Sequence, residues 1–242
     1  MHFRVIRFMS EAGHKLRMKP VSLATAAMVY HKIVDTDSTW KSFDPYLIAT
    51  TSIYLASKIE EDHAKIRDVV NVCYRCMHPD LPPLDMGTTY NALKDSVAHC
   101  ELFLLRMLKF HVTFEHPHKY LLYFLDSLEK WLAPDKQSTK DIVAMTAWGL
   151  LTDSYHGNMC LRYTAKDIAV ATLYLALQCY GVEVPCNKES ELPWYEAFVE
   201  GIKIQTIRKI IGELIDLYDL ETLAIPGKTA PDGINTSRQE AL

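Results

Sequence analysis

Apolar residues recur at spacings of three and four along most of the chain, which is the period of an amphipathic α-helix. The clearest stripe consists of Leu93, Val97, Cys100, Leu104 and Leu108. No stretch shows the sustained alternation of apolar and polar residues that is typical of a half-buried strand. The pattern therefore predicts an all-α protein.

The predicted helices form two sets of five. In the first half we expect helices at Phe3–Leu16, Leu23–Val34, Pro45–Lys58, Lys65–Cys76 and along the 93–108 stripe. In the second half we expect them at His118–Leu132, Thr139–Tyr155, Ala165–Tyr180, Trp194–Glu200 and Lys203–Leu220. Two starts carry a capping signal, Ser22 in one case and Asp44 followed by Pro45 in the other.

The two halves are also related in sequence. "IATTSIYLA", which begins at Ile48, matches "IAVATLYLA", which begins at Ile168, 120 positions later. The same offset pairs Ala24 with Ala144, so the match is not confined to one segment. A fixed offset at separate places indicates a duplication. We therefore predict two domains, at 1–113 and 114–224, joined near Pro117, where a new helix can begin.

The matching segment is expected to be the centre of each domain. It is apolar nearly all round, which is typical of a helix buried on every side. Ala49, Ser52 and Ala56 keep one side small, which allows neighbouring helices to approach closely. Residues 225–242, rich in proline, glycine and polar residues, are expected to form a disordered tail.

The end of the first central helix has an unusual charge pattern. Lys58 is followed by Glu60, Glu61 and Asp62, although the C-terminus of a helix carries partial negative charge and disfavours acids. A solvated helix end is the simple interpretation. The repeat favours a partner site, because it keeps the apolar segment but replaces Lys58 with Gln178.

Composition excludes several classes of function. The net charge of -4 and the pI of about 6.2 do not suit a protein that binds nucleic acid through a basic surface. The charged N-terminus does not resemble a signal peptide, and no apolar run is long enough to span a bilayer. We expect a nuclear or cytoplasmic location, with the cysteines as thiols.

Candidate chemistry is sparse. Cys73 and Cys76 form a C-x-x-C motif, but no second pair completes a structural zinc site, and buried thiols are the expected alternative. Cys160 near His156 lacks an orienting third group for nucleophilic catalysis, as does Cys100 beside His99. No glycine-rich phosphate loop is present. We expect no catalytic residues, metal or cofactor.

Two five-helix repeats, with "YLASKIEE" ending the third helix and "CELFLLRMLKF" within the fifth, resemble the cyclin family. The resemblance covers roughly Phe3 to Leu220. It implies two tandem cyclin boxes in a non-catalytic subunit that binds a cyclin-dependent kinase as a heterodimer. Such a subunit activates the kinase by pressing on its mobile αC helix. Three stretches, "HPHKYLL", "DSYHG" and "IAVATLYLALQCYGVEVP", narrow the resemblance and imply cyclin-dependent kinase 10 as the partner.

The resemblance also implies kinase-binding residues, which are polar on one side and apolar around it. They are Lys58, Glu61, Glu101, Ile59, Leu105, Phe110 and Val112. The residues themselves agree with this placement, because Glu101 and Leu105 are four apart and share one helix face. The ammonium group of Lys58 offers three donors to a partner's backbone carbonyls.

Two alternatives use the same fold. A transcription-factor scaffold related to factor IIB would need a zinc ribbon before the first repeat and a basic face, neither of which the sequence shows. An adaptor that no longer binds a kinase would be expected to have lost Lys58 or Glu101. The first helix, "FRVIRFMSEAGHKL", lacks the substrate-docking motif of cell-cycle cyclins and is more similar to transcription-type members.

Overall fold

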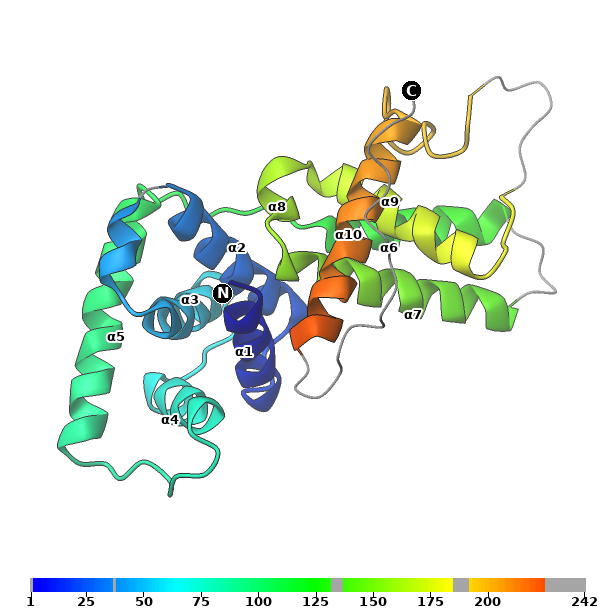
Figure 1. Cartoon of the computed structure of the whole chain (residues 1–242). Coiled ribbons are helices and arrows are strands. Elements are labelled where there is room, and N and C mark those ends of the chain that lie inside the picture. Colours follow the sequence, from blue (N-terminus) through cyan, green and yellow to red (C-terminus); the bar gives the residue numbers. More distant parts are fainter. Residues whose placement is uncertain (1, 37, 132–136, 185–191, 225–242) are drawn as a thin grey trace, which may run out of the picture.

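The computed structural model describes residues 2–36, 38–131, 137–184 and 192–224, and these residues contain helices and no strand. The predicted all-α class is therefore confirmed. Helices α1–α5 form one group and α6–α10 form the other (Figure 1). The predicted disordered tail, 225–242, lies outside the described residues.

The first group is built around one central helix. Its elements are α1 (His2–Lys15), α2 (Pro20–Thr36), the short 3-10 helix η1 (Ser38–Ser42), α3 (Pro45–Ile59), α4 (Ile66–Met77) and α5 (Thr88–Met107). Helix α3 contacts α1, α2, α4 and α5. Ala49 and Ala56 are fully buried on it, so the small side chains lie where the neighbouring helices approach. The predicted N-cap is also present, since the Asp44 side chain accepts a hydrogen bond from the Tyr46 backbone N–H at 3.2 Å.

The second group repeats this arrangement. Its elements are α6 (Pro117–Trp131), α7 (Gln137–Asp153), the 3-10 helix η3 (Ser154–His156), α8 (Met159–Arg162), α9 (Ala165–Cys179) and α10 (Ile204–Ala224). Helix α9 contacts α6, α7, α8 and α10, as α3 contacts its own neighbours. Ala169 and Ala176 of α9 are fully buried, which matches Ala49 and Ala56 at the 120-residue offset.

Two predicted features are wrong. Helix α2 begins at Pro20, so Ser22 is not its cap but a buried residue within the first turn. Residues 194–201 form successive turns where we expected the helix Trp194–Glu200. Most of their hydrogen bonds join residues three apart, such as the Ala197 N–H to the Trp194 carbonyl at 3.2 Å. An apolar run alone does not distinguish such turns from a helix.

The two central helices end in the same type of turn. In the first, the Asp62 N–H donates to the Ser57 carbonyl at 2.8 Å, and in the second the Val182 N–H donates to the Leu177 carbonyl at 2.9 Å. This closure places one residue in the left-handed region. That residue is Gly181 in the second repeat, with φ of 60°, and Glu61 in the first, with φ of 51°.

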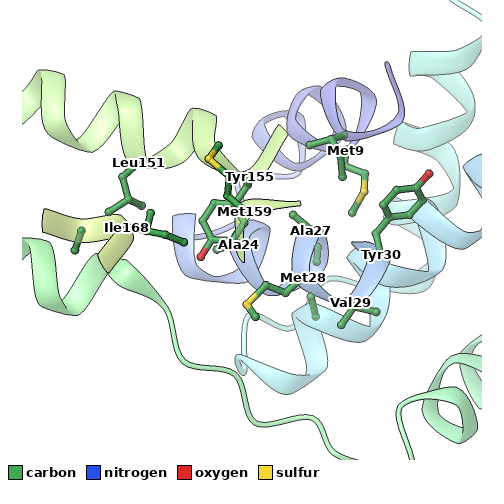
Figure 2. Packing of buried hydrophobic residues seen from close by; sticks show 14 of the residues in the cluster. Met9, Ala24, Ala27, Met28, Val29, Tyr30, Leu151, Tyr155, Met159 and Ile168 are labelled. Carbon is green, nitrogen blue, oxygen red and sulfur yellow. The ribbon is translucent and has the colours of Figure 1, made fainter. Parts of the chain in front are cut away.

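The core continues across the boundary between the groups. Figure 2 shows Ala24 and Met28 of α2 beside Tyr155 and Met159 of the second group. All four side chains are buried. His31, also buried on α2, hydrogen-bonds the Tyr155 carbonyl through Nε2 at 2.8 Å. The groups therefore share one apolar interior rather than meeting through a hydrated surface.

A chain of buried polar groups also crosses this boundary. The Tyr155 hydroxyl lies 2.8 Å from His116 Nδ1, and His116 Nε2 lies 2.8 Å from Thr25 Oγ1, which is 2.6 Å from Glu60 Oε1. The carboxylate of Glu60 only accepts, so Thr25 donates to it and receives the His116 Nε2–H, while Nδ1 accepts from Tyr155. A neutral imidazole, with its proton on Nε2, satisfies every hydrogen bond in this chain. Burial lowers the pKa of His116 to about 4, consistent with this neutral form.

Candidate partner-binding site

The acids at the end of α3 do not all face solvent. Asp62 Oδ2 accepts from the Lys19 backbone N–H at 2.7 Å and from the Ser22 hydroxyl at 2.8 Å, both at the start of α2. Glu60 accepts from Thr25. The negative charge of these acids is unfavourable at the C-terminal end of their own helix. It is favourable at the positive N-terminal end of the neighbouring helix. The simple interpretation of a solvated helix end is therefore wrong for Glu60 and Asp62, whose carboxylates are hydrogen-bonded within the fold.

Lys58 and Glu101 are brought together as an ion pair between α3 and α5. Lys58 Nζ lies 2.7 Å from Glu101 Oε1 and 2.9 Å from Oε2. The ammonium group also lies 4.2 Å from the centroid of the Tyr54 ring, one helical turn earlier on α3. A carboxylate on one side and an aromatic face on the other hold the lysine side chain in a defined position.

The pair is accessible but partly shielded. The Lys58 side chain is 47% exposed and that of Glu101 is 18% exposed. Burial by itself lowers the pKa of Lys58, but the interactions with Glu101 and Tyr54 outweigh it and the net shift of the pKa is upward. The lysine is therefore fully charged at neutral pH. It can direct a further N–H toward a carbonyl oxygen of a bound protein.

The predicted apolar residues differ in exposure. Ile59, Leu105 and Val112 are half-buried and pack against the main core. Phe110 is 62% exposed, although its backbone N–H donates to the Leu105 carbonyl at 2.8 Å and fixes its place just after α5. An exposed phenylalanine held by a rigid turn is suited to contact with a partner.

Glu61 is the acid of the cluster that remains exposed. Among the described residues, its side chain makes no hydrogen bond or ion pair, unlike Glu60 and Asp62. Its backbone is left-handed, whereas the equivalent position of the second repeat is Gly181. A glutamate without an internal partner, in a conformation that favours glycine, is the feature of this turn that the fold does not explain.

The second repeat shows what this position looks like without the charges. Tyr174 is equivalent to Tyr54, whereas Gln178 stands in place of Lys58. The Gln178 amide donates to the Tyr174 hydroxyl at 3.1 Å. The aromatic platform is kept while the cation is lost. Sequence reasoning missed Tyr54, although its spacing of four from Lys58 and its presence in both repeats were available signals.

Two of the cysteines considered from sequence, Cys73 and Cys160, lie in surroundings that disfavour a reactive thiolate. Burial raises the pKa of both Cys73 and Cys160 to about 12, which disfavours the thiolate needed for nucleophilic attack or metal binding. His99 is exposed, and its Nδ1 hydrogen-bonds the Asp95 carbonyl of its own helix at 2.7 Å. Within the described parts of the chain, no group of three potential metal ligands is present.

None of the described helices is both long and apolar enough to cross a membrane.

Comparison with known proteins shows which families this helical architecture resembles. Residues 1–113 match the family model "Cyclin, N-terminal domain". This match contains α1–α5 and the Lys58–Glu101 pair, and it supports the cyclin family for the chain.

Particular relatives extend the similarity beyond that domain. Cyclin-K of Danio rerio is 29% identical over 91% of this chain and 50% of its own length. Cyclin pch1 of Schizosaccharomyces pombe is 31% identical over 87% of this chain and 59% of its own length. The chain thus spans about half the length of these curated relatives. The crystal structure of the yeast RNA Pol II CTD kinase CTDK-1 complex contains a chain with a TM-score of 0.69 and 19% identity, over 96% of this chain and 71% of that one. This likeness supports the fold.

Proposed function

We propose that this protein is a regulatory subunit, itself not an enzyme, that binds and activates a cyclin-dependent kinase through the face formed by α3 and α5. The single observation that carries the proposal is the Lys58–Glu101 pair, held over Tyr54 at the edge of a half-buried apolar surface. The second repeat has Gln178 at the position equivalent to Lys58, so the first repeat provides the main contact.

The chemistry of this face suits the end of a kinase αC helix. Lys58 donates to backbone carbonyls there, while Glu101 fixes the ammonium group and can take a backbone N–H. Leu105 and Phe110 exclude water from these hydrogen bonds, which strengthens them. Docking then holds the αC helix inward, where its glutamate pairs with the catalytic lysine of the kinase.

The relatives support this class of partner. Cyclin-K and cyclin pch1 are named as cyclins, and the similar solved chain belongs to a complex named as a kinase. We further propose cyclin-dependent kinase 10 as the kinase and a place beside cyclin Q within the family, because "HPHKYLL", "DSYHG" and "IAVATLYLALQCYGVEVP" resemble that member. A nuclear or cytoplasmic heterodimer with roles in transcription or the cell cycle follows from that proposal.

Co-expression with a panel of cyclin-dependent kinases tests the proposal. The wild-type chain is expected to capture one kinase and to switch on its phosphotransfer activity. Lys58→Glu is expected to do neither while keeping its helical circular dichroism. Lys209→Glu, at an exposed lysine of α10, is the matched charge control and should behave as wild type. Normal capture and activation by Lys58→Glu would show that the site is misplaced.

A charge swap separates the partner contact from the internal ion pair. The double variant Lys58→Glu with Glu101→Lys keeps an ion pair between α3 and α5. It exchanges the positions of the positive and negative charges that face the kinase. We expect it to recover the thermal stability of the wild type without recovering kinase binding. Recovery of both would mean that the pair serves only the fold.

A further inference from the structure

A second surface, on the other half of the molecule, has the composition of a binding site. A pocket of about 370 Å³ lies between α6, the start of α9 and the turns at 194–201. It is lined by Lys119, Tyr120, Tyr123, Phe124, Lys166 and Phe198. Four aromatic rings and two lysines therefore meet in one small concavity, far in sequence from the proposed kinase-binding face.

The aromatic rings form a continuous wall. The centroid of the Phe124 ring lies 4.6 Å from that of Phe198, 5.9 Å from that of Tyr123 and 6.3 Å from that of Tyr120. Phe124 is buried behind the others, whereas Tyr123 is 64% exposed. Such a wall accepts the flat face of a ring, and proline-containing peptides are commonly bound by aromatic-lined grooves.

The two lysines converge on one edge of this wall. Lys119 Nζ, from α6, lies 4.8 Å from the centroid of the Tyr120 ring, and Lys166 Nζ, from α9, lies 5.5 Å from the same centroid. Within the part of the chain that the structure describes, Lys166 makes no ion pair. Two ammonium groups near one ring disfavour a cationic ligand and favour an anionic one.

An internal anion already occupies part of this edge. Glu115 accepts from Lys119 at 3.0 Å and from the Tyr120 hydroxyl. These hydrogen bonds lower the pKa of the Glu115 carboxylate. The lysine and the hydroxyl are thus arranged to hold an anionic oxygen. Glu115 is 59% exposed, so an incoming anion with a higher charge can compete with it.

From these observations we propose that the pocket binds a phosphorylated peptide segment in which the phosphorylated side chain is next to a proline. The phosphate lies between Lys119 and Lys166, and the proline ring packs on Tyr123 and Phe198. A single-stranded nucleic acid offers similar chemistry, but it needs a longer basic groove than two lysines provide, and the net charge of the chain is -4. This site does not depend on the proposed kinase contact.

Binding of a fluorescent peptide with one phosphoserine–proline pair, in an otherwise alanine and glycine background, tests the proposal on the full chain. We expect saturable binding that weakens with added salt. The unphosphorylated peptide should not bind, and phosphoserine followed by alanine should bind more weakly. Equal binding of the phosphorylated and unphosphorylated peptides would overturn the proposal, as would stronger binding of a single-stranded oligonucleotide of equal charge.

Variants connect the binding to this pocket. Lys166→Ala should weaken the binding of the phosphopeptide by about five-fold, as expected for the loss of one partly exposed ion pair. Tyr123→Ala should remove the preference for proline. Glu115→Gln should strengthen binding, because it removes a competing negative charge. Unchanged binding in all three would overturn the proposal, while kinase capture by Lys166→Ala, measured in parallel, keeps this result separate from that of the kinase-binding site.

Discussion

Replacing Glu61 with glycine is expected to stabilise the fold and to weaken kinase binding at the same time. Glu61 has a φ of 51°, in the left-handed region, where a side chain costs about 1–2 kcal/mol. Within the described part of the chain, its side chain makes no hydrogen bond that would be lost. Glycine adds about 0.5–1 kcal/mol of entropy to the unfolded chain, which offsets part of the gain. The net expectation is about 0.5–1 kcal/mol in favour of the folded state.

Thermal unfolding followed by circular dichroism measures this effect. For a chain of this length, about 1 kcal/mol corresponds to a shift of about 2–4 °C in Tm. Glu61→Gly should therefore raise Tm by about 1–4 °C. Gly181→Glu is the matched control, because it makes the opposite change at the equivalent turn. No atom lies within 4 Å of the Cβ that it would add, so its expected cost comes from the backbone conformation alone.

The two variants together can refute the reasoning. If Gly181→Glu leaves Tm unchanged, the left-handed turn is not strained by a side chain. If Glu61→Gly lowers Tm while Gly181→Glu also lowers it, Glu61 makes a stabilising interaction that the structure does not show. Weaker capture of the kinase by a more stable Glu61→Gly protein would support a role for Glu61 in partner binding rather than in the fold.

Three further predictions concern the interior. Burial lowers the pKa of His116 and His118 to about 4, from 6.5. The unfolded chain therefore binds more protons than the folded chain, and stability falls as the pH drops from 6.5 toward 4. The loss is about 1.4 kcal/mol per pH unit for each histidine. Urea unfolding between pH 7.5 and 5 measures this slope, and His116→Gln should reduce it. Ala56→Leu should cost about 1–3 kcal/mol by overpacking the centre of the first half, whereas Ala92→Leu, on the exposed side of α5, should be nearly neutral in the same assay. Thr25→Val should cost about 1–3 kcal/mol, because it leaves the buried His116 Nε2–H without its acceptor and Glu60 without its donor; an unchanged midpoint would show that water replaces the hydroxyl.

Much of the fold could be predicted from the sequence because the helical periodicity and the duplication independently indicate the same helices. The small residues Ala49 and Ala56 recur as Ala169 and Ala176, and both pairs are buried as expected. The turns at 194–201 could not be predicted in this way. Their aromatic residues suit either a helix or a packed loop, and tertiary contacts decide between them.

The candidate site was predictable in part. Lys58 and Glu101 were both expected at the partner-binding site, and the structure places the two side chains in contact. The roles of Glu60 and Asp62 could not be foreseen, because their partners, Thr25 and Ser22, lie at least 35 residues away in sequence. A charge that is unfavourable for its own helix can be favourable for another helix that only the fold brings near.

The buried hydrogen-bonded chain from Tyr155 through His116 to Thr25 distinguishes a domain defined by sequence similarity from a domain defined as a folding unit. The region that matches the cyclin N-terminal domain ends at residue 113, three positions before His116. A shortened chain that ends there would retain Thr25 and His31 but would lose the His116 imidazole and the Tyr155 carbonyl to which they are hydrogen-bonded. The boundary recognised by similarity is thus crossed by buried hydrogen bonds and is not expected to be a boundary of cooperative folding. Because the two halves share one apolar interior, we expect them to unfold as a single unit.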